Sequence, residues 1–92
     1  CLPCRVLKQE TYLRPEIARR LAQYTRAEID IETPDGSVTA RRFGVQNVPA
    51  LLILSPQGEE FRSLRTIGAP EPPQLAAILD AGLARSGLAK DD

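Results

Sequence analysis

The sequence opens on CLPCRVLKQETY, residues 1–12, in which two cysteines are separated by two residues and followed by good helix formers. Nothing between Cys4 and Tyr12 breaks a helix. Pro15 predicts the end of this helix, because the residue before a proline resists helical backbone angles. We therefore expect the cysteine pair to lie at the start of a helix. The chain has no other cysteine, so its thiol chemistry rests on this pair.

The composition excludes several classes of protein and site. The 92 residues allow one domain, and 42% apolar with 26% charged residues is the balance of a soluble globular protein. Twelve basic and twelve acidic residues cancel, so net charge gives no argument for a nucleic-acid partner. The absence of histidine excludes Cys–His and Ser–His nucleophile pairs and imidazole metal ligands. No apolar run approaches the roughly 20 residues of a membrane span.

The next part of the chain predicts helix, strand and helix. PEIARRLAQY, residues 15–24, has a proline suited to the first helical turn and an apolar stripe at helical spacing. Residues 27–32 alternate between apolar and acidic side chains, which predicts a half-buried strand. TPDGS, residues 33–37, has the composition of a turn. We expect Ser37 to cap a short helix that Gly44 ends.

The second half of the chain predicts a hairpin and a closing helix. Residues 50–54 form a continuous apolar run, which is typical of a strand buried on both faces. SPQG at 55–58 predicts a tight turn, after which residues 59–67 return as a less buried antiparallel strand. Residues 72–83 have the apolar spacing of an amphipathic helix. The polar positions of the returning strand are Glu60, Arg62 and Arg65.

This order of elements predicts an α/β fold with a mixed central sheet flanked by helices on both faces. The two strands separated by a helix imply a right-handed parallel crossover, and the last two imply a hairpin. We also expect a strand that leads into the first helix, which the given sequence lacks. The predicted domain therefore covers residues 1–85 and is incomplete on its N-terminal side, and residues 86–92 are expected to be a flexible polar tail.

The start of a helix gives the cysteine pair a specific chemistry. Unpaired N–H groups and a partial positive charge in the first turn stabilise a thiolate at Cys1, so we expect its pKa to lie below the value of about 8.5 for a free cysteine. The thiolate attacks a disulfide, and Cys4, one turn further and more shielded, can resolve the resulting mixed disulfide. Pro3 stiffens this turn at a position where its missing N–H costs nothing.

Two other roles for the pair stay open at this point. A purely structural disulfide would close a very small loop and so contribute little stability. A thiolate site for a soft metal such as Cu(I) is chemically reasonable, although one chain offers only two thiolates where a closed zinc site takes four ligands. A reactive pair is favoured, because the CxxC opens a helix beside a strand–helix–strand pattern. We expect no bound metal.

Beyond these local arguments, the chain resembles a known fold. CLPC, then VPALLIL at residues 48–54, a hairpin, a glycine and a final amphipathic helix resemble the thioredoxin fold. CRVLKQETYLRPEIARRLA, residues 4–22, is similar to the C-terminal thioredoxin-like domain of the bacterial DsbD-type membrane thiol:disulfide interchange proteins and their single-domain relatives. The resemblance runs from Cys1 to about Leu83.

The resemblance implies a role for four residues. Cys1 would be the nucleophile and Cys4 the resolving thiol. Pro49 would be a cis-proline that faces the cysteine pair and presents the backbone of Val48 to a substrate strand. No cofactor is implied beyond the redox-active Cys1–Cys4 disulfide.

The resemblance also implies an activity and a location. The protein would be a monomeric protein-disulfide reductase that takes electrons from a membrane donor and passes them to disulfide-containing proteins. It would work in the bacterial periplasm, or tethered to the membrane and facing it; a cytoplasmic thioredoxin-like reductant is the nearest alternative. Leu2-Pro3 is close to the dipeptide of reducing thioredoxins. A Cu(I)-binding module or a redox-inert scaffold on the same fold are the non-enzymatic alternatives.

The chain departs from the family pattern in three ways. The aromatic residue before the first cysteine and the buried acid on the preceding strand are not in this sequence, and Lys8 stands where DsbD-type domains often have a glutamate. Lys8 either favours the thiolate or is an ordinary surface lysine, which is the reading we favour. We do not expect Glu10 to carry the proton, and we expect Tyr12 and Tyr24 to pack against the core.

Overall fold

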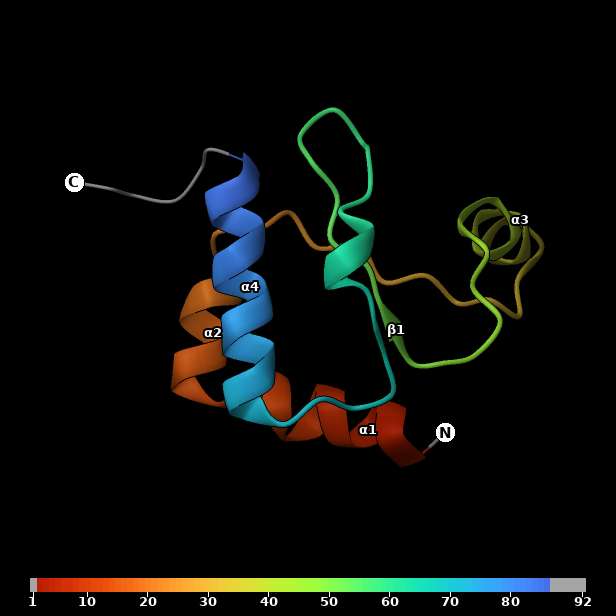
Figure 1. Ribbon diagram of the computed structural model, residues 1–92. Coiled ribbons are helices and arrows are strands. Elements are labelled where there is room, and N and C mark those ends of the chain that lie inside the picture. Colours follow the sequence, from red (N-terminus) through yellow and green to blue (C-terminus); the bar gives the residue numbers. More distant parts are fainter. Residues whose placement is uncertain (1, 87–92) are drawn as a thin grey trace.

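The computed structural model describes residues 2–86, which form helices around one small antiparallel sheet, an α/β arrangement (Figure 1). Within that range the α-helices are α1 (Leu2–Gln9), α2 (Pro15–Leu21), α3 (Pro34–Phe43) and α4 (Pro72–Ser86). The strands are β1 (Ala50–Leu51) and β2 (Thr66–Ile67), and two 3-10 helices are η1 (Thr11–Leu13) and η2 (Arg62–Leu64). The predicted tail falls outside the described residues apart from Ser86, which ends α4.

The start of α2 and the end of α3 follow their local signals, whereas the start of α3 does not. Pro15 is the first residue of α2, and Gly44 ends α3 in the left-handed conformation with φ 69°, both as predicted. The start of α3 differs from the prediction. Ser37 is not its cap, because Thr33 lies one turn earlier and its Oγ1 accepts a hydrogen bond from the Gly36 N–H at 3.0 Å.

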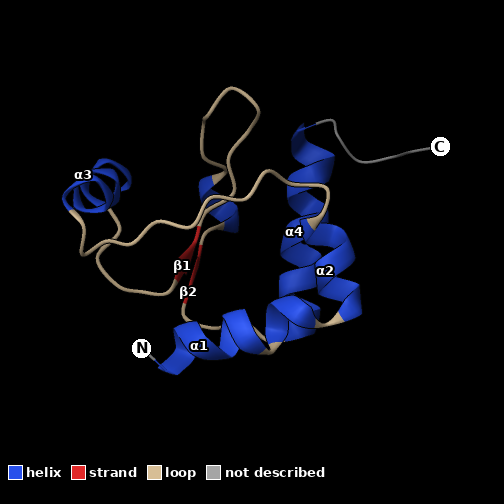
Figure 2. Ribbon diagram, turned by 180° about the vertical axis from the view of Figure 1, so that it is seen from behind, coloured by secondary structure: helices blue, strands red, loops and turns tan. Residues whose placement is uncertain are grey.

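The predicted strand at residues 27–32 is wrong, and so is the parallel crossover built on it. These residues run without strand pairing from α2 to α3 (Figures 1 and 2), and Ile29, which should be half-buried, is 50% exposed. A strand needs a hydrogen-bonded neighbour, and β1–β2 is the only strand pairing of two-residue or greater length in the described part of the chain. The expected mixed sheet is therefore reduced to two antiparallel strands.

The predicted hairpin is confirmed, with shorter strands than expected. Ala50 lies opposite Ile67 and Leu51 opposite Thr66 in antiparallel register. The turn closes where the Gly58 N–H donates to the Ser55 carbonyl at 2.9 Å. The return over residues 59–67 is not one continuous strand, because η2 interrupts it before β2.

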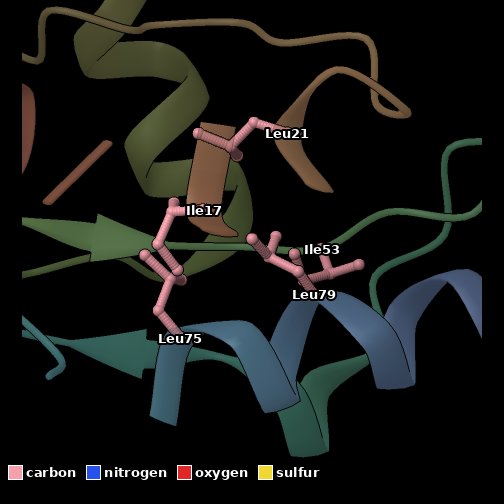
Figure 3. Close-up of a cluster of buried hydrophobic side chains, with 5 residues drawn as sticks. All are labelled: Ile17, Leu21, Ile53, Leu75 and Leu79. Carbon is pink, nitrogen blue, oxygen red and sulfur yellow. The ribbon is translucent and has the colours of Figure 1, made fainter. Parts of the chain in front are cut away.

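The core lies between α2, α4 and the hairpin (Figure 3). Its fully buried side chains are Ile17, Leu75 and Leu79, with at most 1% of each exposed. The predicted apolar face of the last helix is thereby confirmed. The predicted packing roles of Tyr12 and Tyr24 are also confirmed, because both are partly buried against this cluster.

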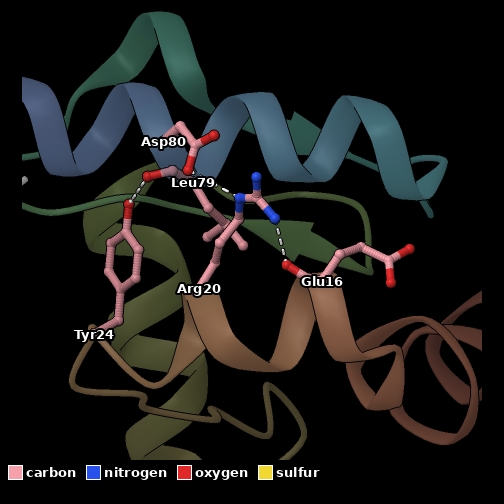
Figure 4. A network of polar contacts seen from close by, with 5 residues as sticks. All are labelled: Glu16, Arg20, Tyr24, Leu79 and Asp80. Carbon is pink, nitrogen blue, oxygen red and sulfur yellow. Dashed lines mark hydrogen bonds and ion pairs between the residues drawn. The ribbon is translucent and has the colours of Figure 1, made fainter.

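Polar contacts fix the position of α2 against α4 (Figure 4). The Tyr24 hydroxyl, just after α2, donates to the Leu79 carbonyl of α4 at 2.6 Å. One turn earlier, the Arg20 Nε donates to Asp80 Oδ1 at 2.9 Å. The two helices are therefore held together by polar side-chain contacts as well as by apolar packing.

Gly82 of α4 should be sensitive to a single added methyl group. A Cβ there would contact the Tyr24 hydroxyl and would lie 2.8 Å from Ile53 Cγ2. We expect Gly82→Ala to cost about 1–3 kcal/mol through overpacking, partly offset by about 1 kcal/mol of helix propensity. Urea denaturation of Gly82→Ala, Tyr24→Phe and the double variant checks this. The cost should be smaller in the Tyr24→Phe background, and equal costs in both backgrounds would rule out the hydroxyl contact as the cause.

Candidate active site

Helix α1 places the cysteine motif. It begins at Leu2, the residue after Cys1, so the predicted helix start is confirmed, and Pro3 lies in its first turn as expected. The helix ends at Gln9, earlier than predicted, and the chain continues into η1. Cys1 itself lies outside the described residues.

Cys4 is the described member of the cysteine pair. It is half-buried and disulfide-bonded, whereas Leu2 and Pro3 beside it are exposed. The first turn of α1 contains no acidic residue. The partial positive charge of this helix end is therefore not offset by a carboxylate from the same turn.

An open pocket of about 740 Å³ is lined by both Cys4 and the Val48-Pro49 segment. Cys4 belongs to α1, whereas Val48 and Pro49 follow α3 in the chain. The Val48–Pro49 peptide bond is cis, in agreement with what the resemblance implies. The Val48 side chain is 45% exposed, so this segment is accessible from outside. Of the predicted site residues, Cys4, Val48 and Pro49 thus line one pocket.

The two tyrosines form part of the wall of this pocket. Burial raises the pKa of the Tyr12 phenol; the Arg26 guanidinium, 5.4 Å from the ring centroid, opposes that rise and Glu28 adds to it. Burial likewise raises the pKa of Tyr24, with a smaller contribution from Asp80. Both phenols are therefore neutral near pH 7 and act here as packing groups.

An ion pair that the sequence did not predict joins Glu60 and Arg65 in the returning half of the hairpin. The Arg65 guanidinium holds Glu60 through two bonds, Nε to Oε2 at 2.7 Å and Nη2 to Oε1 at 2.6 Å. The sequence predicts these two residues as polar positions of a less buried strand, whereas their side chains have low exposed fractions, 16% for Arg65 and 5% for Glu60. Their opposite charges are the only sequence signal, and that signal does not predict burial.

No protein-family model matches the sequence. Most of the chain is similar to bacterial thiol:disulfide interchange proteins. It is 30% identical over 81 residues to thiol:disulfide interchange protein DsbD 1 of Pseudomonas aeruginosa, which covers 86% of this chain and 14% of that protein. It is 26% identical over 70 residues to DsbD of Pseudomonas fluorescens, covering 74% of this chain and 12% of that protein. The chain is therefore distantly similar to DsbD proteins and spans about one seventh or less of their length.

Lys8 forms an ion pair with Glu28. DsbD-type domains often have a glutamate at the position of Lys8. The Lys8 Nζ lies 2.9 Å from Glu28 Oε2, and the two side chains are 59% and 74% exposed. Such exposed pairs contribute about 0–1 kcal/mol. The contact agrees with the surface role, and an influence of Lys8 on the thiols stays a hypothesis. Glu10 is exposed after the end of α1.

None of the helices in the described region has the length and apolar character that a membrane crossing requires.

The Glu60–Arg65 pair predicts an acid-sensitive contribution to stability. The hydrogen bond from Arg65 lowers the pKa of Glu60 more than burial raises it. A carboxylate with a lowered pKa stabilises the fold above its unfolded pKa of about 4.3, and this contribution is lost as the pH falls through the folded pKa. Parent and Glu60→Gln should therefore differ in unfolding free energy near pH 7, and the difference should shrink as the pH falls below about 4.3 and through the lower pKa of the folded state. Urea titrations across this range check it; a difference that does not change with pH would contradict it.

Proposed function

We propose that the chain is a thioredoxin-like thiol:disulfide oxidoreductase that reduces disulfides of partner proteins through Cys1 and Cys4. One observation carries the proposal: the pocket that Cys4 lines is also lined by Val48 and Pro49. A substrate held at that segment would have its disulfide near the start of α1. Cys4 is disulfide-bonded, which agrees with a pair that closes by oxidation.

The reaction proceeds by two thiolate exchanges. The Cys1 thiolate attacks one sulfur of the substrate disulfide; a Cys1–substrate disulfide forms and the other substrate sulfur leaves as a thiolate. The Cys4 thiolate then attacks Cys1 Sγ, which forms the Cys1–Cys4 disulfide and releases the second substrate thiolate. Two electrons pass to the substrate, and an external dithiol returns the pair to its reduced form.

Each part of the site has a role in this scheme. The positive end of α1 stabilises the attacking thiolate, and Pro3 stiffens the turn between the two cysteines. The exposed Val48 and the following Pro49 offer backbone to an extended substrate segment. The names of the similar proteins support thiol:disulfide interchange. The resemblance to DsbD-type proteins further implies a reducing direction outside the bacterial cytoplasm, with a membrane protein as electron donor and disulfide-containing proteins as acceptors.

Insulin reduction with dithiothreitol as electron donor tests the proposal. We expect catalytic turnover, seen as precipitation of the insulin B chain at substoichiometric protein. A parallel titration with Cu(I) separates the alternative. Tight binding of Cu(I) with no turnover above the dithiothreitol background would replace the proposal with a metal-binding module, and neither activity would leave a redox-inert scaffold.

A further inference from the structure

Arg65 makes a third contact, which links the hairpin to α3. Besides its two bonds to Glu60, its Nη2 donates to the carbonyl of Phe43 at 2.6 Å. Phe43 is the last residue of α3, where carbonyls lack partners within the helix and a cation is favourable. The guanidinium therefore bridges a buried carboxylate and a helix end.

The contact reaches the beginning of the segment that carries Val48. Residues 44–49 follow Phe43 directly, and the left-handed backbone conformation of Gly44 changes the direction of the chain after α3. The other end of the segment is also held by the hairpin, because the Gly68 N–H donates to the Pro49 carbonyl at 2.7 Å. Both ends of the 44–49 segment are thus tied to residues 65–68.

Stability alone does not explain this part-buried ion pair. Desolvation largely cancels the attraction within a buried pair, and apolar replacements of the same size are often as stable. The fork geometry of arginine, however, fixes three oxygens in one plane, which an apolar side chain cannot do. The pair is therefore suited to holding a defined geometry.

We propose that Arg65, held by Glu60, is a positioning residue that fixes the 44–49 segment so that Val48 is presented to a polypeptide substrate. This inference rests on the proposed function and adds to it a determinant of protein-substrate binding. Arg65 touches no reacting atom. Its loss should weaken the binding of protein substrates and leave the chemistry of the thiol pair intact.

Steady-state kinetics of Arg65→Gln with two substrates tests the proposal. We expect KM for insulin to rise about tenfold, which corresponds to about 1.4 kcal/mol of binding free energy. We expect kcat, and the rate with glutathione disulfide, whose short peptides offer fewer contacts than a protein substrate, to stay within about twofold of the parent. Arg65→Lys, which keeps the charge and loses the fork, should show the same split to a smaller degree.

Arg20→Gln is the matched control. Arg20 is also a mostly buried arginine, with 21% of its side chain exposed and an ion pair to Asp80 at 2.9 Å, but it joins α2 to α4 (Figure 4). Its loss should lower stability and leave KM for insulin unchanged. An equal rise of KM in Arg20→Gln, or a parallel fall of both substrate rates in Arg65→Gln, would show a general structural effect and overturn the proposal.

A readout without substrate keeps the test decisive. Hydrogen exchange of the peptide covering residues 44–49 should speed up in Arg65→Gln and Glu60→Gln, but not in Arg20→Gln. Unchanged exchange in the first two variants would overturn the proposal even if activity fell. A parent protein inactive with both disulfides would instead refute the proposed function, which is a different result from an active parent whose Arg65→Gln variant keeps its KM.

Discussion

Cys1→Ser is expected to lower insulin reduction by at least about a thousandfold, the scale seen when an enzyme loses its nucleophile. Cys4→Ser should lower turnover to a similar degree and, in contrast, accumulate a mixed disulfide between Cys1 and the substrate. The reason is that Cys4 is the group that releases this intermediate. Non-reducing gels and mass spectrometry after incubation with insulin measure the trapped species.

The two cysteine variants act as controls for each other. Both replace one sulfur of the same CxxC motif, so a general loss of stability would affect them alike. Only the proposed division of roles predicts trapping in Cys4→Ser and its absence in Cys1→Ser. Trapping by Cys1→Ser would exchange the two roles, and full activity of either variant would refute the mechanism.

Ile17→Ala is expected to have the largest effect on stability, about 2–5 kcal/mol. Ile17 is fully buried between α2 and α4, so its truncation leaves a cavity in the centre of the core. A domain of this size has a total stability of about 5–15 kcal/mol. The variant should therefore unfold at a much lower urea concentration, which circular dichroism during a urea titration measures.

Leu13→Ala is the control for this variant. Leu13 lies one turn before α2 and is 69% exposed, so the same kind of truncation should change the unfolding free energy by less than about 0.5 kcal/mol. Equal costs at the two positions would mean that the core does not lie between α2 and α4. Ile17→Val, which removes one methylene, should fall between them at about 0.5–1.5 kcal/mol.

Elements specified by neighbouring residues could be predicted from the sequence. Pro15 starts a helix and Gly44 ends one because their backbone preferences act on their own positions. The helix over residues 72–83 followed from its apolar spacing, and the hairpin from the turn at residues 55–58. In each case the signal and its effect lie within a few residues of each other.

Elements that depend on partners far away in the sequence could not be predicted. The alternation at residues 27–32 describes side chains suited to a strand, but pairing needs a neighbour that the described residues do not supply. The same holds for Arg65, which donates a hydrogen bond to the Phe43 carbonyl, far away in the sequence. From the sequence alone, Glu60 and Arg65 suggest exposure to solvent, because the contact of Arg65 with the Phe43 carbonyl is not visible there.

The candidate site also contains features that local sequence predicts and features that it does not. The position of Cys4 in a first helical turn followed from local sequence, and α1 confirms it. That Pro49 should lie near Cys4 followed only from the resemblance to thioredoxin-like domains, because nothing in their spacing brings them together. About 5% of X–Pro bonds in folded proteins are cis, so the Val48–Pro49 bond could not be predicted from the residues alone either.

The central claim is that the start of α1 makes the Cys1 sulfur acidic, and its titration is the most direct test. In Cys4→Ser one thiol remains, and the pH dependence of its alkylation by iodoacetamide gives its pKa. We predict a midpoint clearly below about 8.5 in the folded protein and a return to about 8.5 in urea. A folded-state midpoint at or above about 8.5 would contradict the account.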